Sequence, residues 1–344
     1  MKVAVVSAAA LPSPAPTYGG LESIAAYVAE ALAADHEVTL FAARGSRTTK
    51  ASLVETVPPE YEPAPGWPIE GKAWNLMSPL LPAFDVVFDM SHAFHAYRLK
   101  LAHPEVHVVK VFHDLYPART PPPPGSYDVL AGVSKFHARY LEGHWGVPVT
   151  HLYNGIPTDA LTYSAEKEDY LLYLSRLDSG KGAHVFLDIV EQTGWSRAIL
   201  AGEDDPRHGI NEHYRRGILY RAQQLGVDYR GQVSNDEKLE LLAHAKAVVV
   251  PLADPYREVF GIWIIEALAS GTPVFTLDKG ACQELVTRTT GGVADTARNL
   301  AEGIRRFRAG EFEFDPYECR AQARKFDIRT TATAYADLAT SLTR

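Results

Sequence analysis

Two cations stand in one short, glycine-containing stretch of the sequence. Residues 175–182 read Ser-Arg-Leu-Asp-Ser-Gly-Lys-Gly, and an apolar run over 170–174 precedes them. Arg176 offers a planar fork for two oxygens and Lys181 a compact charge, so the pair suits a diphosphate. If the apolar run is a strand, both cations lie at its carboxyl end, where ligands bind in open α/β sheets. The alternative is a solvated basic loop.

Two glutamates form a second set. Glu258 and Glu266 are eight positions apart; Glu258 precedes a predicted helix over 260–269, and Glu266 lies about two turns into it. Apolar residues flank Glu266, and because an unpaired buried carboxylate is costly, we expect it to face a partner. An ionised carboxylate only accepts hydrogen bonds, so sugar hydroxyls are suitable partners. An exposed helix glutamate is the alternative.

A pair of glycines forms a third set. Gly19 and Gly20 follow Tyr18 and precede a predicted helix over 21–34. Glycine lets the backbone approach a ligand closely, and a helix N-terminus presents free N–H groups to an anion. The stretch is not a dinucleotide-binding fingerprint, because residues 7–10 read Ser-Ala-Ala-Ala. A plain glycine turn is the alternative.

The elements that must position these residues alternate between strand and helix. Strands are predicted in the first half over 3–6, 37–43, 86–88, 106–112 and 129–133. The pattern pauses near 154–168 and restarts with strands over 170–174, 198–201, 228–233, 247–250 and 273–277. Helices are predicted over 21–34, 183–191, 212–225, 237–245, 260–269 and 327–342. Repeated βα units of this kind indicate two doubly wound parallel sheets.

Composition limits the classes of protein that the chain can belong to. It has 344 residues, 46% of them apolar, which fits about two globular domains. Its 34 Lys and Arg against 42 Asp and Glu give a net charge of −8, which argues against a nucleic-acid binder. With two cysteines, Cys282 and Cys319, and no apolar run of about 18 residues, we expect a cytoplasmic protein without a transmembrane segment. Peripheral membrane contact is left open.

Taken together, these motifs resemble those of the retaining glycosyltransferases of family four. Residues 258–274, EVFGIWIIEALASGTPV, resemble the family's E-x7-E signature, and residues 174–182, LSRLDSGKG, resemble its donor-phosphate loop. Further likenesses, in the matching order, are the pair Gly19-Gly20, the dipeptide Val133-Ser134 and the junction segment Tyr153-Asn154-Gly155-Ile156. Val259 stands in place of the family's usual proline and Ser175 in place of its usual glycine, and neither change removes a charge.

The resemblance implies the α/β fold called GT-B, with two Rossmann-like doubly wound parallel-sheet domains facing a cleft. It places the acceptor domain in residues 1–155, completed by a C-terminal helix over 327–344 that packs back on it. The donor domain is expected over 156–326. The nucleotide sugar would lie mainly on the second domain and the acceptor mainly on the first.

The resemblance also assigns roles to single residues. Arg176 and Lys181 would bind the donor diphosphate. Glu258 would bind the sugar hydroxyls, and Glu266 the ribose. His113 falls where the family often has a histidine beside the transferred sugar. The predicted catalytic residues are therefore His113, Arg176, Lys181 and Glu258, and the other predicted donor-binding residues are Gly19, Gly20, Gly202, Glu203, Val233, Phe260, Gly261, Ile262 and Glu266.

The implied reaction moves a hexose, with retention, from a nucleotide diphosphate sugar of the UDP-glucose or GDP-mannose type to an acceptor hydroxyl. Arg176, Lys181 and helix N-termini would stabilise the negative charge that develops on the leaving diphosphate. No metal and no cofactor are expected, because no Asp-x-Asp element lies near these loops. The sequence does not say whether the acceptor is a small molecule, a glycan or a lipid.

Two alternative functions share the fold. A nucleotide-sugar epimerase would turn over the donor without an acceptor, and an inactive nucleotide-sugar binding protein would give no product. A metal site has less support: His92 and His95 could share a helical face, near His103 and His107, but no cysteine or acidic trio completes a ligand set.

Overall fold

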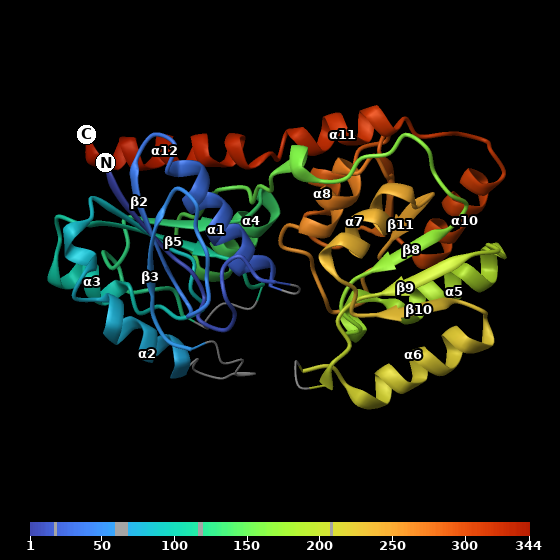
Figure 1. Cartoon of the computed structure of the whole chain (residues 1–344), viewed down its shortest axis with the longest axis horizontal. Helices are drawn as coiled ribbons and strands as arrows, with labels where there is room; N and C mark the ends of the chain where they lie inside the picture. Colours follow the sequence, from blue (N-terminus) through green and yellow to red (C-terminus); the bar gives the residue numbers. More distant parts are fainter. Residues whose placement is uncertain (17–18, 59–67, 116–119, 207–208) are drawn as a thin grey trace. The chain divides into compact units, whose positions relative to one another are not determined.

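Each half of the chain folds around its own parallel sheet in the computed structural model, which describes residues 1–16, 19–58, 68–115, 120–206 and 209–344. One compact unit combines Met1–Pro157 with Asp327–Arg344, and the other is Thr158–Phe326 (Figure 1). The fold class predicted from the sequence, with two Rossmann-like α/β halves, is confirmed.

The first unit has a seven-stranded sheet in the order β3-β2-β1-β4-β5-β6-β7, and every neighbouring pair is parallel. Its central strands are rich in valine, as expected of strands that helices cover on both faces. The strands are β1 Lys2–Val6, β2 Glu37–Ala42, β3 Ser52–Glu55, β4 Val86–Asp89, β5 His107–Phe112, β6 Val129–Gly132 and β7 Thr150–His151. The helices of this unit include α1 Gly20–Leu32, α2 Pro68–Met77, α3 Tyr97–Ala102, α4 Lys135–Trp145 and α12 Ile328–Thr343, with a 3-10 turn, η1, at Leu81–Ala83.

The second unit has a six-stranded parallel sheet in the order β10-β9-β8-β11-β12-β13. Its strands are β8 Leu171–Leu174, β9 Ala198–Ala201, β10 Asp228–Gly231, β11 Ala247–Val249, β12 Val274–Leu277 and β13 Gly291–Ala294. Its helices include α5 Ala183–Thr193, α6 Glu212–Gln224, α7 Asn235–His244, α8 Ile262–Ala269, α9 Cys282–Leu285, α10 Ala297–Arg308 and α11 Pro316–Arg324. Two 3-10 turns, η2 Thr158–Ala160 and η3 Ser179–Lys181, complete it.

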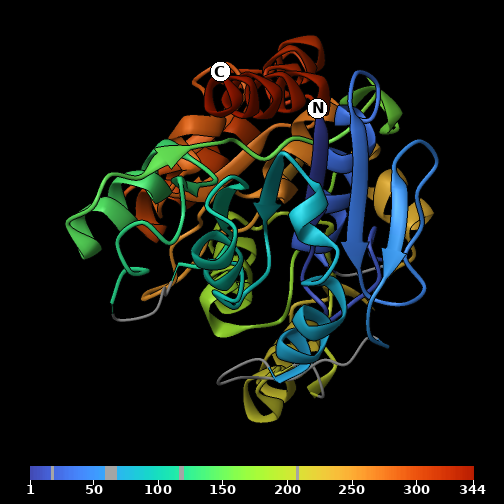
Figure 2. The same cartoon turned by 90° about the vertical axis from the view of Figure 1, so that its left-hand side faces the viewer.

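The last helix returns to the first unit. At its start, Ile328 N donates to Ile156 O at 2.9 Å. Farther along, the fully buried Tyr335 packs its ring 4.9 Å from the ring of Phe88 in β4. Both views place the two chain ends side by side (Figures 1 and 2), and Thr343 Oγ1 donates to Met1 Sδ at 3.5 Å. The first unit is therefore built from both ends of the chain.

The sequence mispredicted several element boundaries, and two of these lie beside predicted site residues. The helix predicted over 260–269 begins only at Ile262, because Gly261 has a left-handed backbone (φ 94°) and caps it. The strand predicted over 228–233 ends at Gly231, so that Val233 lies in the loop that follows.

Candidate active site

A tight loop after β8 carries the two cations that the sequence singled out. Asp178 caps the 3-10 turn that follows, where its side chain accepts a hydrogen bond from Gly180 N at 2.8 Å. The same carboxylate pairs with Arg176, whose Nη2 lies 3.0 Å from Asp178 Oδ2. Gly182 then adopts φ 78° and starts α5. This loop holds Arg176 and Lys181 at the carboxyl edge of the second sheet, as predicted.

Lys181 and Glu258 form a buried ion pair across that edge. Lys181 Nζ lies 2.7 Å from Glu258 Oε2, and the two residues are 8% and 5% exposed. Tyr256 joins the pair, since its hydroxyl accepts from Lys181 Nζ at 2.7 Å and donates to Glu258 Oε1 at 3.3 Å. Trp263 completes it, because its ring N–H donates to Glu258 Oε2 at 3.0 Å. Glu258 thus has a hydrogen-bond partner at each oxygen.

Electrostatic interactions within this cluster keep both Lys181 and Glu258 ionised. Burial alone would raise the pKa of Glu258, but the charge of Lys181 and its hydrogen bonds lower that pKa below its ordinary value. Burial alone would lower the pKa of Lys181, but the charge of Glu258 raises it above its ordinary value. Burial raises the pKa of Tyr256 to about 12, so its hydroxyl keeps its proton. The site therefore presents a fixed ammonium and a fixed carboxylate at neutral pH.

The backbone of Glu258 is held by a glycine that the sequence analysis did not single out. Glu258 N donates to Lys279 O at 3.1 Å, and Ala281 N donates to Glu258 O at 2.8 Å. Between them, Gly280 adopts φ 86°, and a Cβ there would lie 2.2 Å from Glu258 O. Only glycine fits this close approach without a shift of the backbone at Glu258.

The other residues predicted around this signature lie at the start of α8. Gly261 caps the helix, and Ile262 is its first residue, so the free N–H groups of the first turn lie just beyond Glu258. Phe260 is buried and packs edge-on against Phe326, with ring centroids 5.7 Å apart. The arrangement offers an anion-binding helix end next to the ion pair.

Glu266 has a protein partner in this structure. Its Oε1 lies 2.7 Å from Lys238 Nζ of α7, and the side chains of Lys238 and Glu266 are 24% and 20% exposed. The expectation that this carboxylate faces a partner is met by a lysine from another helix. Its predicted contact with ribose hydroxyls remains a prediction.

The loop after β9 packs directly on the cation loop. Gly202 has φ 146°, and a Cβ there would lie 1.8 Å from Ser175 O. Glu203 is 4% exposed, accepts from Leu177 N through its carbonyl at 2.9 Å, and accepts from Asp205 N through Oε1 at 2.7 Å. Both residues therefore lie next to the loop of Arg176, and their assignment to the donor site remains a prediction.

Three predicted residues belong to the first unit. His113 directly follows β5, and its Nε2 is buried without a hydrogen-bond partner among the described residues. Burial lowers its pKa to about 3, so the ring is neutral at physiological pH. Gly19 caps α1 with φ 139°, and Gly20 is the first residue of the helix. Tyr18, which the sequence grouped with them, lies outside the described residues.

Sequence reasoning missed Tyr256 and Trp263, although both contact Glu258. Their signal was weak, because an aromatic residue near a helix start is usually part of a core. Across the ranges that the structure describes, no group of three His, Cys, Asp or Glu side chains could hold a metal ion. His92 and His95 lie in the segment before α3 and do not share a helix.

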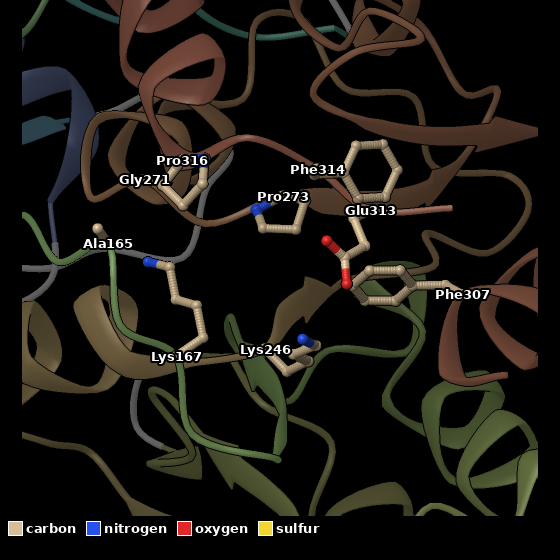
Figure 3. Close-up of a pocket in the computed structure, with 9 residues that line it drawn as sticks. All are labelled: Ala165, Lys167, Lys246, Gly271, Pro273, Phe307, Glu313, Phe314 and Pro316. Atoms are coloured by element: carbon tan, nitrogen blue, oxygen red, sulfur yellow. The ribbon is translucent and has the colours of Figure 1, made fainter. Parts of the chain in front are cut away.

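A cavity of about 220 Å³ lies elsewhere in the second unit, at the amino ends of its strands (Figure 3). Lys246 and Pro273, which directly precede β11 and β12, line it together with Lys167 and Phe307. Lys167 Nζ donates to Ala243 O at 2.7 Å, Ser270 O at 3.1 Å and Thr272 Oγ1 at 2.9 Å. This lysine links the ends of α7 and α8, and none of the predicted site residues lines the cavity.

Comparison with known proteins gives two family matches. Residues 18–160 match the family described as "Glycosyltransferase Family 4", and residues 162–326 match "Glycosyl transferases group 1". A glycogen synthase of Mycobacterium tuberculosis is 28% identical over 204 residues, which are 55% of this chain and 48% of that protein. The chain thus spans about half the length of the curated relatives that it matches first.

Solved structures resemble the chain over nearly its whole length. AviGT4, a glycosyltransferase involved in avilamycin A biosynthesis, is 26% identical with a TM-score of 0.74, over 100% of this chain and 98% of that one. HepE of Anabaena, in complex with UDP-glucose, is 17% identical with a TM-score of 0.73, over 99% and 100%. Within the part of the chain that the structure describes, no helix has both the length and the apolar character needed to cross a membrane.

Proposed function

Because the chain belongs to the glycosyltransferases of family four and has the GT-B fold, we propose that it moves a hexose from a nucleotide diphosphate sugar to an acceptor hydroxyl. We further propose that the donor is of the UDP-glucose or GDP-mannose type and that the anomeric configuration is retained. The Lys181–Glu258 pair is the observation that supports this proposal most, because it joins a cation suited to phosphate and a carboxylate suited to sugar hydroxyls.

The proposed chemistry is electrostatic. As the bond between the sugar and the phosphate breaks, negative charge develops on the leaving diphosphate. Arg176, Lys181 and the N-terminus of α8 would stabilise that charge, a task worth several kcal/mol in comparable oxyanion sites, on the order of 3–4 for one donor. Glu258 would hold the sugar by accepting from its hydroxyls. Under this proposal no metal and no cofactor takes part.

Retention does not require a covalent intermediate in this proposal. A retaining glycosidase uses two carboxylates about 5 Å apart, one of them a nucleophile. Glu258 is held by Lys181, Tyr256 and Trp263, which lowers its readiness to attack. We therefore propose that the acceptor attacks from the face that the diphosphate leaves, with the diphosphate oxygen taking the acceptor's proton.

A thermal-shift screen tests the donor. UDP, GDP, UDP-glucose and GDP-mannose are each added to the protein, and a donor that binds raises its melting temperature by mass action. We expect a shift from one nucleotide family, which Arg176→Ala and Lys181→Ala abolish. Lys325→Ala, which replaces an exposed lysine of the same unit, keeps the shift. No shift from any of the four ligands would contradict the proposal.

Turnover assays separate the proposal from its alternatives. We expect Lys181→Ala and Glu258→Ala each to lower transfer by about 100-fold or more, with circular dichroism confirming that they fold. Conversion of the donor sugar to its epimer without an acceptor would identify an epimerase. Donor binding without any turnover, across a broad acceptor panel, would identify a binding protein.

A further inference from the structure

Four charged side chains are buried together at the carboxyl edge of the first sheet, although the parallel-sheet fold does not need them. Glu22, Glu70, Asp89 and Lys110 are 5%, 2%, 1% and 1% exposed. A buried charge is costly unless it is paired and hydrogen-bonded. The contacts of these four residues show what compensates the cost of burying their charges.

Three of the four hold one short loop, residues 91–93, in place. Lys110 Nζ lies 3.2 Å from Asp89 Oδ2 and donates to the carbonyls of Ser91 and Ala93. Asp89 Oδ1 accepts from Ser91 N at 3.0 Å. Glu70 reaches over from α2, and its Oε1 accepts from the N–H of His92 at 2.9 Å. These three buried side chains therefore fix the backbone conformation of residues 91–93.

The fixed loop of residues 91–93 positions the His92 side chain beside Asp114. His92 Nδ1 lies 2.6 Å from Asp114 Oδ2, and the two side chains are 15% and 59% exposed. Burial alone would lower the pKa of His92, but its hydrogen bond to Asp114 and the charge of that carboxylate raise it. Asp114 directly follows His113 after β5, so this pair opens to solvent at the edge of the sheet where ligands bind.

Glu22 is the fourth buried charge, and it holds no loop. Within the described residues its carboxylate accepts from its own backbone N–H, and no other residue donates to it. It lies near enough to His92, Glu70 and Asp114 to interact electrostatically with all three. His113 Nε2, beside the same group, is also buried without a partner in this part of the chain. A buried ring nitrogen that lacks a partner among the described residues, as His113 Nε2 does, indicates a ligand that supplies one.

We propose that Glu22, His92 and Asp114 bind the acceptor, and that this acceptor is a hydroxyl-rich molecule without an anionic group. This inference rests on the proposed transferase function. The carboxylates of Glu22 and Asp114 are hydrogen-bond acceptors. They therefore need O–H or N–H donors from the ligand. The site's four carboxyl groups, those of Glu22, Glu70, Asp89 and Asp114, outnumber its cations, His92 and Lys110. Burial raises the pKa of Glu22 to about 6 and also raises the pKa of Glu70, but the excess of acidic groups persists at neutral pH. A phosphate or carboxylate brought here would be repelled.

Three matched acceptors test whether the site disfavours an acceptor that carries an anionic group. Glucose, glucosamine and glucose 6-phosphate share one ring and differ in charge, and each is offered with the donor that the thermal-shift screen selects. We expect transfer to glucose and glucosamine, and at least tenfold lower kcat/KM for glucose 6-phosphate. The proposal is overturned if glucose 6-phosphate is the best acceptor, or if the protein binds the donor but neither binds nor uses glucose or glucosamine.

Substitutions of Glu22 and His92 test whether these residues bind the acceptor. Glu22→Gln keeps the shape of the side chain and removes its charge, so we expect KM for the acceptor to rise at least tenfold while the donor-induced thermal shift is unchanged. His92→Asn is a second variant with the same expectation. Glu142→Gln, an exposed glutamate of α4, is the matched control and should change neither quantity. Unchanged acceptor KM in both site variants would refute the assignment, whereas loss of the donor shift in the wild type would refute the transferase function itself.

Discussion

His113 has a buried ring nitrogen, Nε2, and a pKa far below the ordinary value for histidine. Burial lowers its pKa to about 3, and Asp114, His137, His92 and Lys110 are the titratable groups that act on it. The folded protein therefore keeps this ring neutral, while the unfolded chain takes up a proton near pH 6.5. Between about pH 6.5 and pH 3 the unfolded state binds more protons, so stability falls as the pH falls.

We predict that His113→Gln flattens this acid dependence. For one histidine with these two pKa values, the loss of unfolding free energy between pH 7 and pH 5 is about 2 kcal/mol. Denaturant unfolding of the wild type and the variant at both pH values measures the difference. His213→Gln, an exposed histidine of the second unit, should leave the slope unchanged. Equal slopes in the wild type and His113→Gln would show that His113 is protonated in the folded protein.

The sequence predicted the charged residues of the site better than their partners. Arg176, Lys181 and Glu258 belong to continuous motifs, so their types and spacing could be recognised without a structure. Lys238, which pairs with Glu266, comes from a separate helix, and no local pattern links the two. Tyr256 and Trp263 contact Glu258 through polar tips on apolar rings, and such residues look like core residues in a sequence.

At the scale of elements, the isolated β-bridge that holds Glu258 depends on Gly280. Its φ is positive, and a Cβ at this position would lie only 2.2 Å from Glu258 O, so no larger residue fits without movement. We predict that Gly280→Ala destabilises the second unit by about 1–3 kcal/mol and lowers transfer at least tenfold, because Glu258 shifts away from Lys181. Denaturant unfolding and donor turnover measure the two effects.

A matched glycine separates this local strain from a general effect of alanine. Gly217 lies inside α6, and a Cβ there would meet nothing within 4 Å. Gly217→Ala should therefore stabilise the protein by about 0.5–1 kcal/mol, since alanine favours a helix interior, and leave transfer unchanged. Normal turnover in Gly280→Ala would mean that Glu258 tolerates the shift or has no part in the reaction.

The sequence predicted elements with strong apolar runs, including the edge strand β10, and missed the edge strands β3 and β13. β3 and β13 are short edge strands, and β13 begins with two glycines, so neither gives a clear pattern. The signal for α10 was present: Thr296 caps it, and Leu300, Ile304 and Phe307 recur on one face. Packing against the sheet, rather than local preference, stabilises the edge strands, and a sequence alone does not show that packing.

At the scale of the whole molecule, the first unit cannot be completed until residues 327–344 have been made. α12 belongs to that unit although the whole second unit precedes it in the sequence. Its largest buried side chain is Tyr335, whose ring is fully buried against Phe88 of β4. The Tyr335 hydroxyl is buried without a partner among the described residues. The ring and the hydroxyl should therefore have opposite effects on stability.

Two substitutions at Tyr335 measure these effects. Tyr335→Phe keeps the ring and removes the unpaired hydroxyl, so we predict unchanged stability or a gain of up to about 1 kcal/mol. Tyr335→Ala leaves a cavity against Phe88, and we predict a loss of about 3–5 kcal/mol. Hydrogen exchange localises the effect: amides of β1 and β4 should exchange faster in Tyr335→Ala, while those of β8 and β11 keep their wild-type rates. Faster exchange in both sheets would show instead that the two units unfold together, and a clear loss of stability in Tyr335→Phe would show that the hydroxyl has a partner, such as an ordered water.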